Sequence, residues 1–374
     1  MEYVINRSIR EPELKWLCHY SEMSKNIEHI DGRRLKSGNI EYRYFAGTAY
    51  LGIPYDAEFQ RYMHEGMKKF GSNYGGSRRS NFQFEVYAEF ENWLAVWLGV
   101  EKALTVSSGT LAGQLLRPLV KEFDRIIYLP ADHPAVDYDQ GIYLKNSNDW
   151  HESLRSYLSQ WKGQRILIVS ATVENALLSI LDVELLSQLY KDFPFTLLLD
   201  DSHGIGVLGE SGSGISSLLP SSLRRNTMIV GSLGKAMGLP GGFVGGNADW
   251  VTRIAESPLF GGSSPLIPAS IYAFEKIKST LPDRIKALKT NIATINQYFS
   301  SLDHWKVHPQ LSIATCLNKD VDEYFLKHHC LISSFAYPTP QDPVTSRVVF
   351  NALHSSEDIE WVFNLCRKAV GAMD

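Results

Sequence analysis

The chain has few of the features that would place it in a membrane, outside the cell or on a nucleic acid. Only 4 of its 374 residues are cysteines, and their scatter favours free thiols over a disulfide framework. No apolar run could span a bilayer, and the opening MEYVINRSIREPELKW lacks a signal-peptide core, so we expect a cytoplasmic protein. With 37 basic and 41 acidic residues, the formal net charge of -4 gives no general attraction to nucleic acid or to anionic lipid.

Patterns typical of metal and dinucleotide sites are also missing. His304 and His308 stand four residues apart without an evident third ligand, and the run KHHC is too crowded for standard zinc spacing. We therefore predict no metal site. The segment GLPGGFVGG lacks the glycine spacing of a dinucleotide fingerprint, and the two arginines of GSRRSN are too few for a nucleic-acid surface.

The pattern that is present is an alternation of apolar strands and amphipathic helices. Residues 86–99 carry apolar side chains at helical spacing and end at Gly99, and residues 182–193 resemble a second helix. The short apolar runs RILIVSAT, FTLLLD and TMIVGS are typical of buried strands. Together they predict an α/β fold with a mostly parallel sheet, whose ligands bind where the strands end.

The chain length exceeds that of one hydrophobic core, so we expect a large and a small domain. Beyond about Pro268 a long helical region, residues 282–302, precedes a strand over 346–353 and a helix over 354–370. Ser355 and Asp358 have capping-box spacing at the start of that last helix. We assign residues 1–45 to an N-terminal arm and the start of the small domain, 46–270 to the large domain, and 271–374 to a small C-terminal α+β domain.

Two charged residues stand at neighbouring strand ends. Asp200 closes the strand FTLLLD, and Lys235 follows the strand TMIVGS in a glycine-rich run. An acid that keeps the ring nitrogen of pyridoxal 5'-phosphate (PLP) protonated, with a lysine that forms the Schiff base, is the pair this cofactor requires. Either residue alone is more often a loop cap or a solvated turn residue, but the pair predicts a PLP site.

The segments LLLDDSHGIGVLGESGSG and GSLGKAMGLPGGFVGG resemble the α-oxoamine synthases, a family of fold-type I PLP enzymes. The resemblance extends from TAYLGI near residue 48 to HSSEDIEWVF. It implies that Asp200 binds the pyridine nitrogen, that His203 reaches the ring hydroxyl, and that Lys235 carries the cofactor. Ser232 would help to hold the phosphate.

Other motifs follow the order of the family. VSSGTLAG (with Ser108) resembles its phosphate-binding turn, so Gly109 and Thr110 would donate backbone amides from a helix N-terminus. In LPADHPAV, His133 would stack on the cofactor ring. In SRVVFNALH, Arg347 would bind the substrate carboxylate, for which a bidentate guanidinium is suited.

Additional cofactor contacts are implied by the resemblance at Ser179, and at Gly262 and Ser263 in a segment that crosses to a second subunit. The sequence departs from the family at five positions, several of which shape the acyl-CoA side: Thr48, Tyr87, Asn175, Gly261 and Gly262. These departures weaken the expectation of acyl transfer but not that of the cofactor.

We expect a homodimeric PLP-dependent acyltransferase that condenses an amino acid with an acyl-CoA and releases carbon dioxide. Lys235, Asp200, His203 and His133 would be its catalytic residues. Two alternatives stay open: an aminotransferase or another carbanion reaction without CoA, and a noncatalytic PLP-binding regulatory protein.

Overall fold

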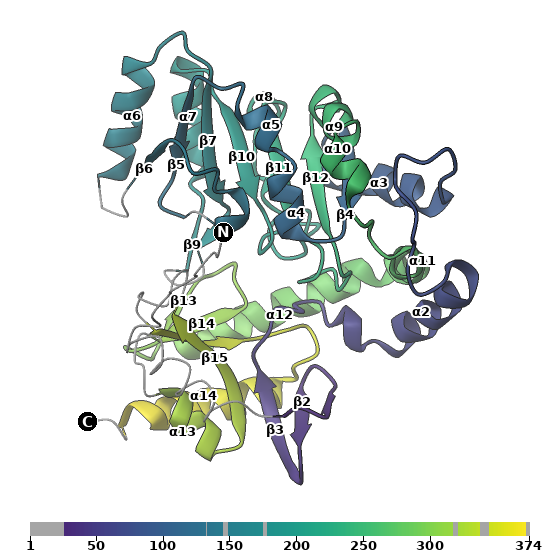
Figure 1. Cartoon of the computed structure of the whole chain (residues 1–374). Helices are drawn as coiled ribbons and strands as arrows, with labels where there is room; N and C mark the ends of the chain where they lie inside the picture. The colour runs from purple at the N-terminus through teal and green to yellow at the C-terminus, as the bar shows by residue number, and fades with distance from the viewer. Residues whose placement is uncertain are drawn as a thin grey trace, which may run out of the picture.

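The structure is a computed structural model that describes residues 26–131, 133–144, 149–174, 178–316, 321–336 and 344–371. Within these ranges the chain forms two seven-stranded sheets and a two-stranded ribbon. Figure 1 shows the first sheet in the upper half of the molecule and the second in the lower half, with helix α12 (Leu281–Phe299) crossing between them. We call them the large and the small sheet.

The large sheet is parallel at its centre, as the sequence predicts. Its strands lie in the order β4 (Lys102–Val106), β12 (Gly242–Gly246), β11 (Thr227–Ser232), β10 (Thr196–Asp200), β7 (Ile166–Ala171), β5 (Arg125–Tyr128) and β6 (Ile142–Tyr143). The three strands expected from their apolar runs are neighbours: β10 pairs in parallel with both β7 and β11. The predicted α/β class with a mostly parallel sheet is confirmed.

Strand β12 was not expected, because its sequence GFVGG lacks the side chains that favour strands. It is buried throughout and runs antiparallel to both β11 and β4. A Cβ atom at Gly242 would lie 2.3 Å from the carbonyl oxygen of Ser108. Glycine is therefore required there by the close approach of the Ser108 backbone, a contact between segments far apart in sequence.

Helices cover the large sheet. α3 (Glu85–Leu98) ends at Gly99, whose φ of 65° is the left-handed C-terminal conformation that glycine adopts most easily, and α7 spans Val183–Asp192. Both helices were expected from the sequence. The others are α2 (Ala57–Phe70), α4 (Gly109–Gln114), α5 (Arg117–Val120), α6 (Trp150–Gln160), α8 (Ser221–Arg224), α9 (Ala248–Ala255), α10 (Pro258–Gly262) and α11 (Pro268–Ile277).

Short elements complete this part. They are the 3-10 turns η1 (Ile53–Tyr55), η2 (Pro134–Val136), η3 (Ile215–Ser217) and η4 (Lys278–Thr280), and the ribbon of β8 (Val173–Glu174) with β9 (Ser179–Ile180).

The small sheet combines strands from the two ends of the described chain. Its order is β1 (His29–Ile30), β2 (Arg34–Ser37), β3 (Ile40–Phe45), β15 (Cys330–Ala336), β16 (Val344–Val349), β14 (Ile313–Cys316) and β13 (Lys306–Val307). β3 and β15 pair in parallel, and α12, α13 (Val321–Lys327) and α14 (Ser356–Gly371) accompany this sheet. The expected strand over 346–353 ends early, at Val349, because the backbone turns at Asn351, whose side chain accepts a hydrogen bond from Leu353 N. The domain boundaries themselves stay a prediction.

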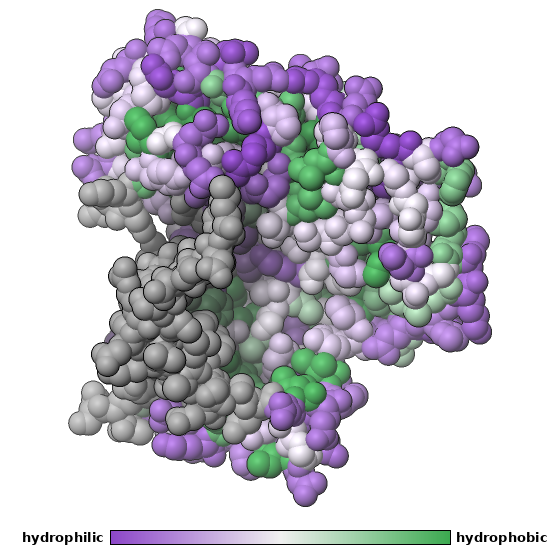
Figure 2. Space-filling model, in the orientation of Figure 1, coloured by the Kyte–Doolittle hydropathy of each residue, from purple (hydrophilic) through white to green (hydrophobic). Residues whose placement is uncertain are grey.

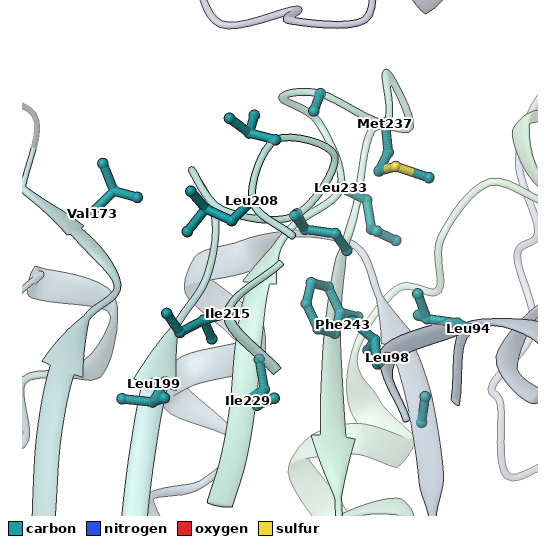
Figure 3. Packing of buried hydrophobic residues seen from close by; sticks show 14 of the residues in the cluster. Leu94, Leu98, Val173, Leu199, Leu208, Ile215, Ile229, Leu233, Met237 and Phe243 are labelled. Carbon is teal, nitrogen blue, oxygen red and sulfur yellow. The ribbon is translucent and has the colours of Figure 1, made fainter. Parts of the chain in front are cut away.

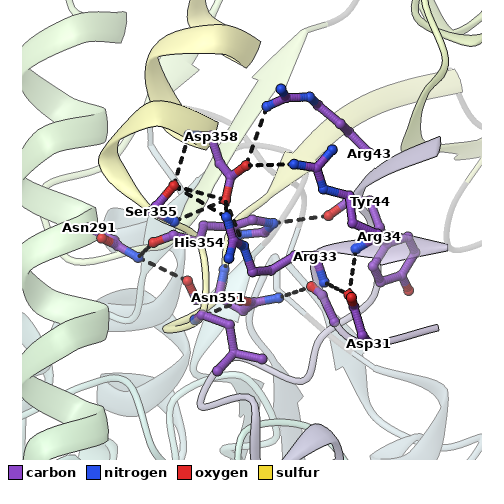
Figure 4. A network of polar contacts seen from close by, with 12 residues as sticks. Asp31, Arg33, Arg34, Arg43, Tyr44, Asn291, Asn351, His354, Ser355 and Asp358 are labelled. Atoms are coloured by element: carbon purple, nitrogen blue, oxygen red, sulfur yellow. Dashed lines mark hydrogen bonds and ion pairs between the residues drawn. The ribbon is translucent and has the colours of Figure 1, made fainter. Parts of the chain in front are cut away.

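Asp358 links the first strands of the small sheet to its last helix (Figure 4). Its buried carboxylate lies 2.6 Å from an Arg33 nitrogen, 3.3 Å from Arg43 and 3.7 Å from Arg34. Ser355 N donates to Asp358 Oδ2 at 3.0 Å, and Asp358 N donates to Ser355 Oγ at 3.3 Å, which confirms the predicted capping box. Burial opposes ionisation, but the Ser355 amide and the Arg33 guanidinium keep the pKa of Asp358 below its ordinary value.

We predict that Asp358→Asn lowers the free energy of unfolding at pH 7 by about 2 kcal/mol, since it weakens charge-assisted bonds to several arginines. Because the pKa of the folded carboxyl is depressed, this stabilisation is complete above the unfolded pKa and is lost as the pH falls through the folded one. The difference between variant and parent should therefore shrink in acid. Urea unfolding measures it, with Glu360→Gln on the exposed face of α14 as the matched control; equal losses in both variants would contradict the assignment.

Candidate active site

Asp200 lies at the carboxyl end of β10, in the centre of the large sheet and with parallel neighbours on both sides. Its side chain is 5% exposed, and Oδ1 accepts a hydrogen bond from Ser202 N at 3.0 Å. Oδ2 lies 3.2 Å from Nδ1 of His133, which precedes η2. Strand ends in such a sheet are where ligands bind, so the carboxylate and the imidazole face the crevice that the sequence predicts.

Lys235 lies in a tight loop between β11 and β12. Gly234 N donates to Ser232 Oγ at 3.1 Å, Leu233 N donates to Gly241 O at 2.8 Å, and Leu239 N donates to Leu233 O at 2.9 Å. Figure 3 shows the apolar side chains around this loop: Leu233 and Met237 belong to it, Phe243 lies below it, and Leu208 and Ile215 lie to one side. The loop is therefore held by packing and by its own hydrogen bonds, and the lysine stands on a rigid base.

Burial changes the acidity of this lysine. It lowers the pKa of Lys235 to about 8, and the negative charge of Asp200 acts in the opposite direction. The effect of Asp200 on this pKa also shows that the two groups lie within electrostatic range of each other. Far more of Lys235 is therefore a neutral amine near neutral pH than of a solvated lysine, and the neutral amine is the form that attacks a carbonyl.

His203 lies between Lys235 and a buried tyrosine. Its Nε2 is 2.8 Å from Lys235 Nζ, and its Nδ1 is 2.8 Å from the hydroxyl of Tyr50. Burial, followed by the positive charge of Lys235, lowers the pKa of His203 well below its ordinary value, so the imidazole is neutral. A neutral imidazole carries one N–H, so His203 can donate to only one of these two neighbours at a time.

Tyr50 is a site residue that the sequence analysis did not single out, although it lies inside the motif TAYLGI. It is 2% exposed, and its backbone oxygen accepts a hydrogen bond from Ala352 N at 2.8 Å. The only earlier signal was its place in that motif, because a tyrosine in an apolar run is typical of a core residue.

The segment expected to hold the phosphate lies next to the lysine loop. Ser108 caps α4 by accepting a hydrogen bond from Leu111 N at 3.1 Å, and a Cβ atom at Gly109 would lie 3.0 Å from the Ser232 backbone. The first amides of a helix have no partner within the helix, and Gly109 and Thr110 are the first two residues of α4, so their predicted role as phosphate donors stays a prediction. Ser232 N donates a hydrogen bond to Ser202 Oγ at 2.8 Å, which fixes the position of the Ser232 backbone.

Arg347 comes from the small sheet, on β16, where it pairs with Thr315 and Ser333. Its side chain is 8% exposed and lies over the ring of Phe335, 4.8 Å from the ring centre. Its positive charge contributes to the low pKa of His203. The structure thus brings Arg347 into the electrostatic range of the large-sheet residues, and Figure 2 shows the surface hollowed between the two halves of the molecule.

The remaining expected contacts are not gathered at this point. Ser179 is exposed on β9, opposite Glu174. Gly262 ends α10 and would place a Cβ atom in open space, while Ser263 Oγ donates to Leu259 O at 2.5 Å. The roles of all three stay predictions.

The positions that depart from the family have local explanations in two cases. The Tyr87 hydroxyl donates to Leu266 O at 2.6 Å, and its ring packs under the Arg78 guanidinium. A Cβ atom at Gly261 would lie 2.9 Å from Arg79 Cδ, so the arginine side chain occupies the space that a side chain there would need. Thr48 O accepts from Tyr50 N at 2.8 Å, and Asn175 lies outside the described residues.

The described residues contain no group of three or more His, Cys, Asp or Glu side chains that could hold a metal ion. In the same part of the chain, no helix is both long and apolar enough to cross a bilayer. Cys330 and Cys366 are free, buried thiols, Cys316 is buried, and Cys18 lies outside the described residues.

This fold, with a strand-end carboxylate facing a buried lysine, defines a PLP-dependent transferase of fold type I. The family model "Aminotransferase class I and II" matches residues 52–364, and the chain belongs to that family.

Relatives with assigned names support the same placement. The chain is 27% identical over 366 residues to 8-amino-7-oxononanoate synthase of Petrotoga mobilis, with 92% of each chain covered. It is 26% identical to the enzyme of that name from Pectobacterium atrosepticum, with 90% of this chain and 91% of the relative covered.

Solved structures share the fold. A serine palmitoyltransferase from S. paucimobilis, with bound PLP, matches with a TM-score of 0.84 at 18% identity, over 96% of this chain and 97% of the other. An 8-amino-7-oxononanoate synthase from Francisella tularensis matches with a TM-score of 0.70 at 21% identity, over 89% and 98%. The resemblance to α-oxoamine synthases is confirmed, and PLP is the cofactor of this chain.

We predict that PLP added to the cofactor-free protein, followed by borohydride, labels Lys235, with a labelling midpoint near pH 8. Asp200→Asn should move the midpoint to lower pH, because it removes the charge that raises the lysine pKa. Peptide mass spectrometry locates the label, and Lys235→Ala serves as the control. A midpoint that rises in Asp200→Asn, or a label elsewhere, contradicts the site.

Proposed function

We propose that this chain is an acyltransferase of the α-oxoamine synthase type, which joins an amino acid to an acyl-CoA with loss of carbon dioxide. The observation that carries the proposal is the convergence of Lys235, His203 and Asp200 at the strand ends, with Arg347 facing them from the other sheet. The names of the two relatives reported above support this reaction over the other reactions of the family.

The residues present match the needs of PLP. Asp200 is a buried acid that would keep the pyridine nitrogen protonated, and His203 is a neutral imidazole that would contact the ring hydroxyl. Gly109, whose missing Cβ permits the close approach of Ser232, would bind the phosphate together with Ser108 and Thr110. When bound, the cofactor withdraws electrons from the α-carbon of an attached amino acid.

Lys235 would hold the cofactor and later move the α-proton of the substrate. Its pKa of about 8 lets Nζ take up and release a proton near neutral pH. His133, beside the Asp200 carboxylate, would stack on the ring, and Ser179 would approach the cofactor from β9. The roles of Lys235 and His133 follow from the family resemblance and from the positions described above, whereas the role of Ser179 follows from the resemblance alone.

Arg347 would bind the carboxylate of the amino acid. A guanidinium offers two parallel N–H donors to a carboxylate, and the charge of Arg347 acts on His203 across the two sheets. The substrate would therefore lie between the two sheets, with its α-carbon toward Lys235.

The deciding experiment incubates the purified protein with single amino acids, with and without an acyl-CoA, and follows cofactor absorbance, free CoA and carbon dioxide. Release of CoA and carbon dioxide together supports the proposal. Amino-group transfer without CoA indicates an aminotransferase, and a cofactor band that no amino acid changes indicates a binding protein without catalysis.

We predict that Asp200→Asn keeps bound cofactor but exchanges the substrate α-proton with solvent at least about 100-fold more slowly, since each 1.4 kcal/mol of lost transition-state stabilisation is about tenfold in rate. The phosphate contacts do not involve this side chain, so retention should not suffer. Deuterium incorporation, measured by NMR, reports the rate. Unchanged exchange would reject Asp200 as the partner of the ring nitrogen.

The working unit of the proposal is a homodimer with shared active sites, in the cytoplasm. Exposed apolar side chains support it: Phe82 is 64% and Leu259 49% exposed. The loop before Phe82 is joined to α10 through Ser77, which donates to Gly261 O, so these two side chains belong to one connected region. The free buried thiols of Cys330 and Cys366 are typical of a reducing compartment.

We predict that mixing Lys235→Ala chains with Gly262→Trp chains restores activity, up to about half of the native value per hybrid dimer. In the hybrid, one site carries both lesions and the other carries none. Gly262→Trp is suited to this test because its Cβ meets nothing in its own chain, so any loss of activity comes from the partner's site. No recovery after verified subunit exchange, or a fully active monomer, contradicts the shared site.

A further inference from the structure

Asp201 is a second buried carboxylate directly after Asp200. Its side chain binds other partners than that of Asp200. It is 0% exposed. Oδ1 accepts a hydrogen bond from Thr172 Oγ1 at 2.5 Å, and Oδ2 accepts one from Ile215 N at 2.9 Å. None of the proposed cofactor contacts uses this group.

The backbone of Asp201 is held as firmly as its side chain. Its N–H donates to Val230 O on β11 at 2.8 Å, and its carbonyl accepts from Gly204 N and Ile205 N at 3.0 Å each. Thr172, which holds the side chain, also donates its own N–H to Asp200 O at 2.9 Å. Asp201 thus connects the ends of β7, β10 and β11 to the loop that follows β10.

That loop, residues 201–215, carries His203 and returns to its start. Gly206 N donates to Gly212 O at 2.7 Å, Gly214 N donates to Leu208 O at 3.1 Å, and the loop ends at Ile215 on the Asp201 carboxylate. The carboxylate therefore closes the loop at its base, two residues from the imidazole that contacts Lys235.

Two glycines leave room for the carboxylate. A Cβ atom at Gly204 would lie 1.9 Å from Asp201 Oδ1, and one at Gly214 would lie 1.9 Å from Oδ2. Gly214 also has a φ of 77°, which by itself favours glycine, whereas no left-handed φ explains Gly204. Any side chain at position 204 would therefore collide with Asp201 Oδ1, and glycine avoids this collision.

We propose that Asp201 is a positioning residue: its carboxylate clamps residues 201–215 so that Asp200 and His203 keep their places opposite Lys235. The catalytic part of this inference rests on the proposed function. Burial, with a smaller contribution from the charge of Asp200, raises the pKa of Asp201 to about 7, so a neutral side chain of the same shape is an informative replacement. An asparagine can accept from Ile215 N and donate to Thr172 Oγ1.

The first experiment is a double-mutant cycle in thermal stability, which needs neither cofactor nor substrate. In the native background Gly204→Ala should lower Tm by at least about 3 °C, because its methyl group collides with the carboxylate. In the Asp201→Ala background the same change should cost nothing or raise Tm, since the colliding oxygen is gone and alanine restricts the unfolded chain. An equal loss in both backgrounds overturns the clamp.

The second experiment separates positioning from stability. Asp201→Ala should shift the pH midpoint for labelling of Lys235 and slow α-proton exchange roughly 10- to 100-fold at saturating amino acid, with KM changed less than about threefold, because small misplacements of catalytic groups are costly. Asp201→Asn should restore the midpoint and most of the rate. Asp192→Ala, at an exposed acid on α7, is the matched control.

If Asp201→Ala does not fold, Thr172→Val makes the same comparison, because it removes one hydrogen bond and leaves the carboxylate in place. An unchanged midpoint and rate in that variant, or in Asp201→Ala, contradicts the proposal. If the native protein exchanges no α-proton but the stability cycle shows the predicted sign change, the proposed function fails and the clamp stands.

Discussion

The end of β10 imposes the constraint on which the site depends. A strand in the middle of a buried parallel sheet must pass into an irregular loop without leaving its last polar groups unpaired. Here Asp200 O, Asp201 N and Asp201 O all find backbone partners, on Thr172, Val230 and the first residues of the loop. The two carboxylates can then diverge, one toward the crevice and the other toward the base of the loop.

Burial of Lys235 and His203 away from water determines their protonation. Burial makes Lys235 a weaker base and keeps His203 neutral, so the two nitrogens can lie 2.8 Å apart without two like charges in contact. Arg347, from the other sheet, adds a further positive charge that also lowers the pKa of His203. The site therefore needs both halves of the molecule, and the fixed loop around Lys235 holds the reacting groups in place.

The sequence predicted the central strands, the helix ending at Gly99 and the Asp200–Lys235 pair, because each has a strong local signal in apolar period, capping glycine or strand-end charge. It did not predict β12, since the run GFVGG has few side chains and its pairing is decided by neighbours distant in sequence. Asp201 and Tyr50 were missed for a related reason. Each has a partner far along the chain, Ile215 for the aspartate and His203 for the tyrosine, and no spacing rule reports such pairs.

The parallel pairing of β3 with β15 has a consequence for biosynthesis. Residues 40–45 leave the ribosome early, whereas their partner strand emerges only after the whole large sheet has been made. The segments of the large sheet, between residues 102 and 246, can assemble while translation continues, but the edge of β3 that receives β15 stays open until residues 330–336 have been made. The newly made chain thus carries an unpaired strand edge throughout the synthesis of the large sheet, and such an edge can pair with another chain until β15 arrives.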